Sequence, residues 1–272
     1  MKIITLIENT EGSCGCASKH GLSFYIETNN HTLLMDTGPN SLLKENAETL
    51  GIDLKKVDTV ILSHGHYDHG GGLPTFFSIN KDAKWYLPKL SVGEYYSIHN
   101  GEKHYIGLPK LEPTMPIIWT EEAYSIDKEL ELFSNISLHY PLFSTNLDLK
   151  EKTDSGFIQD TFSHEQCLVI HENGKDILFS GCAHHGMDNI LERYHHLYHK
   201  DPHIVISGFH TMKPDGYTDL DKLEIQELAK RLQSTSIQFY TCHCTGLEAY
   251  QWMKEIMNDQ IEYLHCGDTL NL

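Results

Sequence analysis

Residues 63–73 read SHGHYDHGGGL, a stretch that places three imidazoles and one carboxylate within a few consecutive positions. His64 and His66, at alternate positions of a tight turn, can face one ion, while Asp68 and His69 point to a second. Imidazole and carboxylate are ligands that suit Zn²⁺ and its first-row neighbours. A polar loop with chance histidines is the alternative, but four ligand-type residues in this order predict a two-metal site.

Apolar runs that end in metal-capable residues recur along the chain. Residues 57–62 form a β-branched run that predicts a buried strand leading into the 63–73 stretch. Functional residues collect at the carboxyl ends of strands in open α/β sheets, so we expect these strand ends to share one edge. The other runs, with the residues that follow them, are 177–179 (Cys182, His184), 204–206 (His210) and 237–240 (His243).

Helices are expected between and after these strands, which predicts an α/β fold. The pattern favours helices over about 188–198 and 219–232, and a third that ends near Met257. Thr245, followed by Glu248 three residues later, forms a capping-box pattern that predicts the start of this third helix.

The chain length suffices for one domain over 1–272, since no repeat, low-complexity tract or linker divides it. Between about 80 and 161 the pattern loosens, with five prolines and many aromatic residues. We expect this segment to be an insertion that lies over the metal site. Nothing in the sequence indicates an oligomeric state.

Charge and cysteine content limit the partners. With 38 acidic against 21 basic side chains the formal net charge is −17, which repels a phosphate backbone, so nucleic acid is not an expected partner. The N-terminal apolar run is too short for a signal peptide or a membrane span, so we expect no membrane association and a cytoplasmic location. Seven cysteines favour reduced thiols or metal ligands over disulfides. Cys242 and Cys244 lack the second spaced pair of a zinc knuckle.

The chain resembles the metallo-β-lactamase superfamily, whose His-x-His-x-Asp-His motif stands here as His64, His66, Asp68 and His69. The resemblance covers nearly the whole chain. It implies a four-layer αβ/βα sandwich, in which two β-sheets face each other, helices lie outside and the metals sit at one edge. It also implies that Asp36, in the Asp-Thr-Gly at 36–38, supports a metal-binding histidine without touching the metal itself.

The same resemblance implies a third histidine for the first metal, a bridging carboxylate and a last histidine for the second metal. His164 matches the third histidine and His243 matches the last one. Where the family usually has an aspartate after a strand, this chain has Cys182, whose thiolate can ligate or bridge Zn²⁺. Two alternatives stay open, in which Cys182 is a small buried residue and His184 is the competing ligand.

Four further motifs are similar to a narrower branch of the superfamily. That branch contains metal-dependent hydrolases and proteins like dihydropterin-ribofuranosylaminobenzene-phosphate synthase, and it is weak evidence for a substrate because one scaffold hosts many chemistries. His210 lies outside the usual ligand set, and we expect it to face the substrate or support a ligand, with a buried structural histidine as the alternative. The motifs are HGLS at 20–23, GCAHHG at 181–186, GFH at 208–210 and HCTG at 243–246.

The expected activity is hydrolysis at a dinuclear centre of two divalent ions, with Zn²⁺ preferred and Mn²⁺ or Fe²⁺ as alternatives. Two such ions lower the pKa of a shared water, so that a metal-bound hydroxide attacks, and they polarise a carbonyl or phosphoryl oxygen. We expect Asp68 to hold the second ion and orient the nucleophile. His210 or His184 would donate to the developing oxyanion or the leaving group.

The aromatic insertion is expected to provide apolar walls for a small-molecule substrate, namely an ester, phosphoester or lactone. Two other functions stay open. One is a pterin-precursor synthase-type transferase that uses the metals as Lewis acids, and the other is a ligand-binding sensor on a hydrolase scaffold. The complete ligand set argues against the sensor, because a retired site commonly loses ligands.

Overall fold

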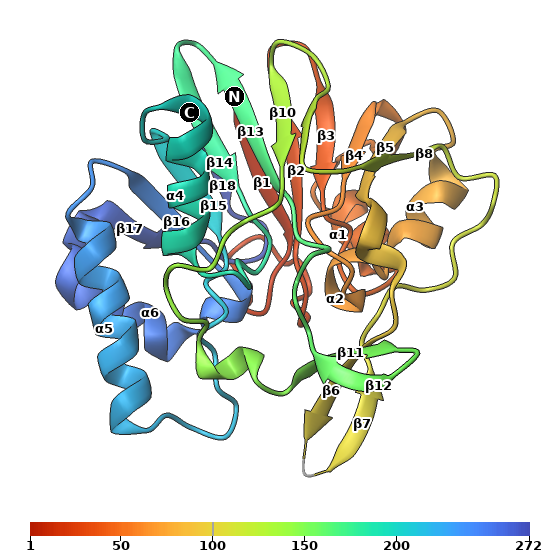
Figure 1. The fold of residues 1–272 in the computed structure, drawn as a ribbon. Coiled ribbons are helices and arrows are strands. Elements are labelled where there is room, and N and C mark those ends of the chain that lie inside the picture. The colour runs from red at the N-terminus through yellow and green to blue at the C-terminus, as the bar shows by residue number, and fades with distance from the viewer. Residues whose placement is uncertain (100) are drawn as a thin grey trace.

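Two seven-stranded β-sheets form the centre of the computed structural model, which describes residues 1–99 and 101–272 (Figure 1). The first sheet has the order β18-β1-β2-β3-β4-β5-β8 and the second β17-β16-β15-β14-β13-β10-β9. The first sheet consists of β1 (Lys2–Ile7), β2 (Ser23–Glu27), β3 (Thr32–Met35), β4 (Thr59–Ile61), β5 (Lys84–Pro88), β8 (Ile117–Thr120) and β18 (Thr269–Asn271). The second consists of β9 (Ala123–Ser125), β10 (Leu130–Phe133), β13 (Cys167–Glu172), β14 (Lys175–Phe179), β15 (Ile204–Ser207), β16 (Gln238–Thr241) and β17 (Ile261–Tyr263).

Helices cover the outer faces of the two sheets (Figure 1). Among the described residues, no helix is both long and apolar enough to cross a membrane. The α-helices are α1 (Leu42–Thr49), α2 (Tyr67–Gly70), α3 (Leu73–Ile79), α4 (Met187–Tyr198), α5 (Asp219–Gln233) and α6 (Leu247–Met257). Short 3₁₀ turns are η1 (Leu54–Lys56), η2 (Lys89–Val92), η3 (Ser144–Asn146), η4 (His243–Thr245) and η5 (Asn258–Gln260).

Alternation along the strands creates the layers, because successive side chains of a strand point to opposite faces. In β3, Leu33 and Met35 pack against the other sheet, whereas Leu34 packs under the helices of its own side. Both faces are therefore buried, as expected for parallel strands covered on two sides. The result is the αβ/βα sandwich that the resemblance implies, so the predicted fold is confirmed.

The parallel strands bring the predicted strand ends to one edge. Strands β3, β4, β5 and β8 run parallel in the first sheet, as do β14, β15, β16 and β17 in the second. The predicted runs correspond to β4, β14, β15 and β16, and the predicted helices to α4, α5 and α6. The loops that follow these strands carry the candidate ligands.

The capping box predicted at Thr245 is wrong. Thr245 ends the turn η4, and its hydroxyl accepts a hydrogen bond from the Phe209 amide at 2.9 Å and pairs with the Thr241 hydroxyl at 2.5 Å. This side chain therefore links two strand ends and does not cap α6, whose N-cap is Gly246. A capping box does occur at the start of α5, between Thr218 and Asp221.

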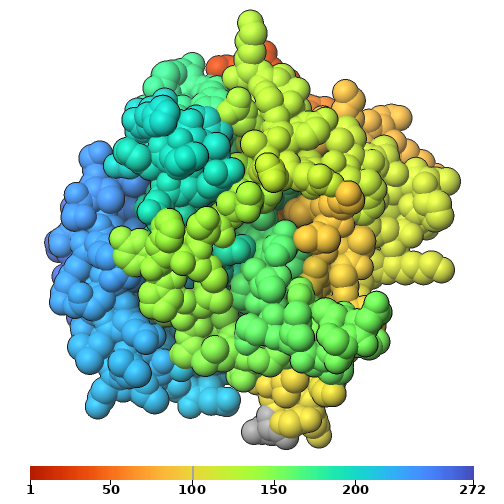
Figure 2. Space-filling view, viewed as in Figure 1, coloured from red at the N-terminus to blue at the C-terminus, as the bar shows by residue number. Residues whose placement is uncertain are grey.

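The segment 80–161 contributes strands both to the sandwich and to a separate sheet. Strands β5 and β8 belong to the first sheet, and β9 and β10 to the second. Only a four-stranded sheet of order β12-β11-β6-β7 stands apart, at the lower end of Figure 1, so the predicted insertion is too long. Figure 2 shows this segment, in yellow to green, spread over the front of the molecule. The separate sheet consists of β6 (Tyr95–His99), β7 (Glu102–Tyr105), β11 (Leu149–Thr153) and β12 (Gly156–Gln159).

Candidate metal centre

The first ligand group consists of three buried imidazoles. His64, His66 and His184 each offer a ring nitrogen, and these atoms lie within 4.8 Å of one another. The Nε2 atoms of His64 and His184 are 3.3 Å apart. Two nitrogens bound tetrahedrally to one Zn²⁺ at ~2.05 Å lie ~3.3 Å apart, so this spacing fits a shared cation.

The second ligand group has the same spacing. Nε2 of His69 is 3.3 Å from Nε2 of His243, and Oδ2 of Asp68 lies 3.3 Å from His243 Nε2 and 3.6 Å from His69 Nε2. These three side chains come from α2 and η4, which follow β4 and β16 in the two different sheets. Both sheets of the sandwich therefore contribute ligands to the site.

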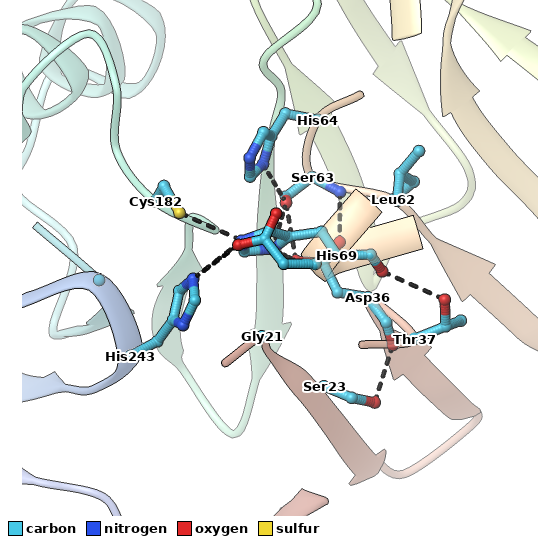
Figure 3. Close-up of polar contacts among 12 residues, drawn as sticks. Gly21, Ser23, Asp36, Thr37, Leu62, Ser63, His64, His69, Cys182 and His243 are labelled. Carbon is cyan, nitrogen blue, oxygen red and sulfur yellow. Dashed lines mark hydrogen bonds and ion pairs between the residues drawn. The ribbon is translucent and has the colours of Figure 1, made fainter. Parts of the chain in front are cut away.

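Cys182 lies between the two groups. Its Sγ is 3.1 Å from His69 Nε2, and it clusters with His64 on one side and with His243 on the other (Figure 3). Gly181 permits this approach, because a Cβ there would lie 2.2 Å from the Ser63 hydroxyl. Burial and the neighbouring Cys244 raise the pKa of the Cys182 thiol, so only a bound cation would favour its thiolate.

The Nδ1 atoms of four ligand histidines contact oxygen atoms. Each oxygen accepts a hydrogen bond from Nδ1–H, so the Nε2 atom of the neutral ring keeps its lone pair, directed at the site. A neutral imidazole with its proton on Nδ1 is the tautomer that binds a metal through Nε2. The contacts are His64 to Ser63 Oγ at 2.8 Å, His69 to Asp36 Oδ2 at 2.6 Å, His184 to Asn146 Oδ1 at 2.8 Å and His243 to Asn9 Oδ1 at 2.8 Å.

Asp36 organises two of these contacts (Figure 3). Its Oδ1 accepts from the Ser63 amide at 2.7 Å, and its Oδ2 accepts from the Ser63 hydroxyl at 2.7 Å and from His69. Because the Ser63 hydroxyl donates to Asp36, its oxygen is left to accept from His64. One fully buried carboxylate therefore orients one histidine directly and another through Ser63.

Burial keeps the imidazoles of His64, His184 and His243 neutral, whereas for His69 burial lowers the pKa but the charges of Asp36 and Asp68 outweigh it and raise the pKa. Burial acts together with neighbouring imidazoles to hold the pKa of His64 and of His184 well below the usual range. Burial also lowers the pKa of His243, to about 3. For Asp68 burial raises the pKa, but the charge of His69 and hydrogen bonds outweigh it and the pKa falls well below its usual range. Neutral imidazoles beside an ionised carboxylate form a donor set suited to a divalent cation.

His164 is held differently from the other site histidines. Its Nδ1 accepts a hydrogen bond from the Gly65 amide at 3.0 Å, so a neutral ring carries its proton on Nε2, which faces Asp160 Oδ2 at 3.3 Å. Neither ring nitrogen then has a lone pair free for a metal. The geometry therefore favours His184 as the third imidazole of the first group. His164 instead stabilises the loop at Gly65 through its hydrogen bond with the Gly65 amide.

His66 has a buried ring atom that lacks a hydrogen bond. Its Nε2 finds no hydrogen-bond partner among the described residues, and the Oδ2 of Asp160 lies 3.5 Å away. An orphaned polar atom in a buried site is costly unless an additional ligand satisfies it. A buried ring nitrogen without a hydrogen bond, next to other imidazoles, is consistent with a site that binds a metal ion.

A cavity of about 500 Å³ opens onto the two ligand groups. Tyr67 is the only phenol or phenyl ring among its described lining residues, so the aromatic residues of 80–161 do not provide the apolar walls as expected. Instead Trp85 lies in the core, and Tyr96 packs against Tyr105 and Phe157 on the four-stranded sheet. The cavity lining combines apolar surface with polar side chains, which include His20, Ser97, His99, Ser144, Thr145, Asp148, His210, Lys213 and Asp215.

Several residues of the site were missed by the sequence analysis. Asn9 and Asn146 accept from ligand histidines, and Glu165 accepts hydrogen bonds from the His184 and His185 amides. Isolated asparagines and glutamates carry no signature in a sequence. His20, whose Nε2 lies 3.3 Å from Asp68 Oδ2, stood in the HGLS motif, but no role was inferred for it.

Comparisons with known proteins identify relatives of this chain. Two relatives from Methanocaldococcus jannaschii are similar over nearly their whole length. One is an uncharacterized protein, 28% identical, with 94% of each chain covered. The other is 7,8-dihydropterin-6-methyl-4-(beta-D-ribofuranosyl)-aminobenzene-5'-phosphate synthase, 26% identical, with 99% of this chain and 96% of the relative covered.

A solved structure and a family model complete the comparison. The crystal structure of a metal-dependent hydrolase of the beta-lactamase superfamily is 26% identical, with a TM-score of 0.81 and 100% of this chain and 99% of that chain covered. The family model of the metallo-beta-lactamase superfamily matches residues 19–229, which include both the 63–73 stretch and Cys182. The chain therefore belongs to the metallo-beta-lactamase superfamily.

Proposed function

We propose that the protein is a hydrolase that cleaves a small ester, phosphoester or lactone at a dinuclear metal centre. The observation that carries this proposal is the pair of adjoining ligand groups, with free imidazole lone pairs, at a cavity of about 500 Å³. When bound, two divalent cations supply a nucleophile at neutral pH and polarise the substrate oxygen. Zn²⁺ fits best, because the thiol of Cys182 is a soft ligand.

The protein side chains would hold and orient the reactants. Asp68 is ionised and lines the cavity, so it can both bind the second cation and orient a nucleophile by accepting a hydrogen bond from it. Asp36 keeps His69 and His64 aimed inward, which spares reorganisation during the reaction. Ser144 and Thr145 line the same cavity, and their hydroxyl groups donate to Asp221 and to the His210 carbonyl.

His210 is an acceptor in this arrangement. The Thr145 hydroxyl donates its single proton to the His210 carbonyl, so its oxygen must accept from His210 Nδ1, 3.1 Å away. Burial, together with His66, lowers the pKa of His210 to about 4, so at neutral pH the ring is uncharged and Nε2 carries a lone pair. We therefore assign His210 the role of accepting a hydrogen bond from the substrate or the nucleophile, in place of the donor role expected from the sequence.

The test is hydrolysis by metal-loaded protein. Protein reconstituted with Zn²⁺, Mn²⁺ or Fe²⁺ is assayed on p-nitrophenyl phosphate, bis-p-nitrophenyl phosphate, p-nitrophenyl acetate and an acyl lactone. Turnover is expected for at least one substrate, with loss in Asp68→Asn and no change in His196→Ala, an exposed histidine on α4. Protein that carries two metals per chain but turns over none of these substrates would contradict the proposal.

A synthase-type transfer is the second candidate, favoured by the similarity to the M. jannaschii synthase. The two reactions differ in the fate of water. Hydrolysis in H₂¹⁸O places ¹⁸O in a product, whereas transfer to an organic acceptor does not. Metal-dependent product formation without ¹⁸O would favour the synthase.

A further inference from the structure

We propose that Asn9 holds His243 and His20 in opposite tautomers, so that His243 can bind the second cation while His20 donates a hydrogen bond to Asp68. The proposal rests on the dinuclear centre of the proposed function. Asn9 follows β1, far in sequence from the His64–His69 run, and its amide contacts Nδ1 of both histidine rings, whose centroids are 4.9 Å apart.

The orientation of the Asn9 amide is fixed by two backbone groups. The Gly21 amide can only donate, and it lies 3.2 Å from Oδ1. The His243 carbonyl can only accept, and it lies 3.2 Å from Nδ2. Exchanging the oxygen and nitrogen of the amide would break both contacts, so their assignment follows from the backbone.

This orientation gives the two histidines different protons. His243 Nδ1 faces the amide oxygen at 2.8 Å and must donate, which leaves the Nε2 lone pair directed at Asp68 and His69. His20 Nδ1 faces the amide nitrogen at 3.4 Å and must accept, which places the proton of a neutral ring on Nε2. That Nε2 lies 3.3 Å from Asp68 Oδ2.

The backbone around His20 is built for this contact. Gly21 has a φ of +145°, and a Cβ there would lie 2.5 Å from the Asp68 carbonyl oxygen. The next amide, that of Leu22, donates to the same carbonyl at 3.1 Å. The loop is thus tied to Asp68 by its main chain, and a glycine is needed at the point of closest approach.

His20 is accordingly a positioning residue for Asp68 and not a further metal ligand. Its side chain is 49% exposed at the cavity, so it supports the carboxylate from the open side. Carboxylate ligands of metals are commonly held by such hydrogen bonds, and loss of one weakens metal binding roughly 10–100-fold. Asn9 therefore orients one proposed metal ligand, His243, and also His20, which supports a second ligand, Asp68.

The experiment reads the tautomers directly in the metal-free protein. Long-range ¹H–¹⁵N correlation spectra of ¹⁵N-histidine-labelled protein, recorded above pH 8, distinguish a proton on Nδ1 from one on Nε2. We expect Nδ1–H for His243 and Nε2–H for His20. Asn9→Asp keeps the acceptor and replaces the donor by a second acceptor, so His20 should change to Nδ1–H while His243 stays unchanged.

Metal affinity is the second readout, by competition with a chelator. Asn9→Ala should weaken the second ion roughly tenfold or more and leave the first within about twofold. Asn80→Ala is the matched control, because Asn80 is a buried asparagine that bonds the backbone far from the ligands, at Leu54 and Val57. It should lower stability without changing either metal affinity.

Two results would overturn the proposal. One is a wild-type spectrum with His20 and His243 in the same tautomer, and the other is a His20 tautomer unchanged in Asn9→Asp. Neither measurement uses a substrate, so absence of hydrolytic activity would count against the proposed function alone.

Discussion

Asp36→Asn tests whether the two acceptor oxygens of this buried carboxylate, and not the size of its side chain, orient the ligand histidines. Asp36 accepts three hydrogen bonds at 2.6–2.7 Å, from the Ser63 amide, the Ser63 hydroxyl and His69 Nδ1. An asparagine keeps the size but replaces one acceptor oxygen by an NH₂ group. In either amide orientation, at least one of these donors then faces another donor.

The cost can be worked out from these contacts. A buried donor that loses its acceptor costs about 1–3 kcal/mol of unfolding free energy. His69 can avoid this cost by moving its proton to Nε2, but that proton then occupies the lone pair directed at His243 and Cys182. We therefore expect affinity for the second cation to fall roughly 10–100-fold.

Chelator competition and urea denaturation of metal-free protein measure the two effects. The matched control is Asp176→Asn, a buried carboxylate at the start of β14 that accepts from His171 at 2.9 Å and Tyr194 at 2.5 Å. It should lose stability but keep its metals. The reasoning fails if Asp36→Asn binds both cations as tightly as the wild type does.

Three further predictions concern the other site residues. Cys182→Asp should retain two metals per chain with a shift in preference toward Mn²⁺, while Cys182→Ala should lose the second metal first, as elemental analysis would show; unchanged affinity in Cys182→Ala would exclude bridging. His184→Phe should lose the first cation, whereas His164→Phe should mainly lower the melting temperature; the reverse result would make His164 the ligand. The unfolding free energy of metal-free protein should fall by about 1.4 kcal/mol from His243 alone between about pH 7.5 and 5.5, because its folded pKa of about 3 lies below the unfolded value of about 6.5 and the unfolded state binds the proton. His64 and His184 act in the same direction and His69, whose pKa is raised, acts against it, so urea titrations at several pH values should show stability rising with pH.

Local pattern was sufficient to predict the strands that carry the site. The runs before His64, Cys182, His210 and His243 are short, apolar and β-branched, and a strand needs little more than this to be identified. Convergence at one edge then follows from parallel pairing, which the sheets display. These inferences depend on neighbours in sequence and on a general rule of topology.

Tertiary contacts decided what the local pattern could not. The Thr245 and Glu248 pair satisfies the capping pattern, yet the Thr245 hydroxyl is taken by Thr241 and by the Phe209 amide from another strand end. The irregular pattern at 80–161 likewise gave no sign of β5 and β8. Strand β5, which contains Trp85, pairs with β4 and β8, and both of these lie far from it in the sequence. A rule that uses a few adjacent residues has no access to such competitors.

The choice between His164 and His184 shows why ligand assignment needs the fold. Both histidines flank the same hairpin, so either spacing is compatible with the motif. Ala183 adopts a positive φ of 52°, an uncommon conformation for a side chain with a Cβ. The Glu165 carboxylate stabilises it by accepting from the amides of His184 and His185, at 2.7 and 3.1 Å. The turn directs His184 at His64, and the residue next to His164 in sequence thereby helps to place the competing imidazole.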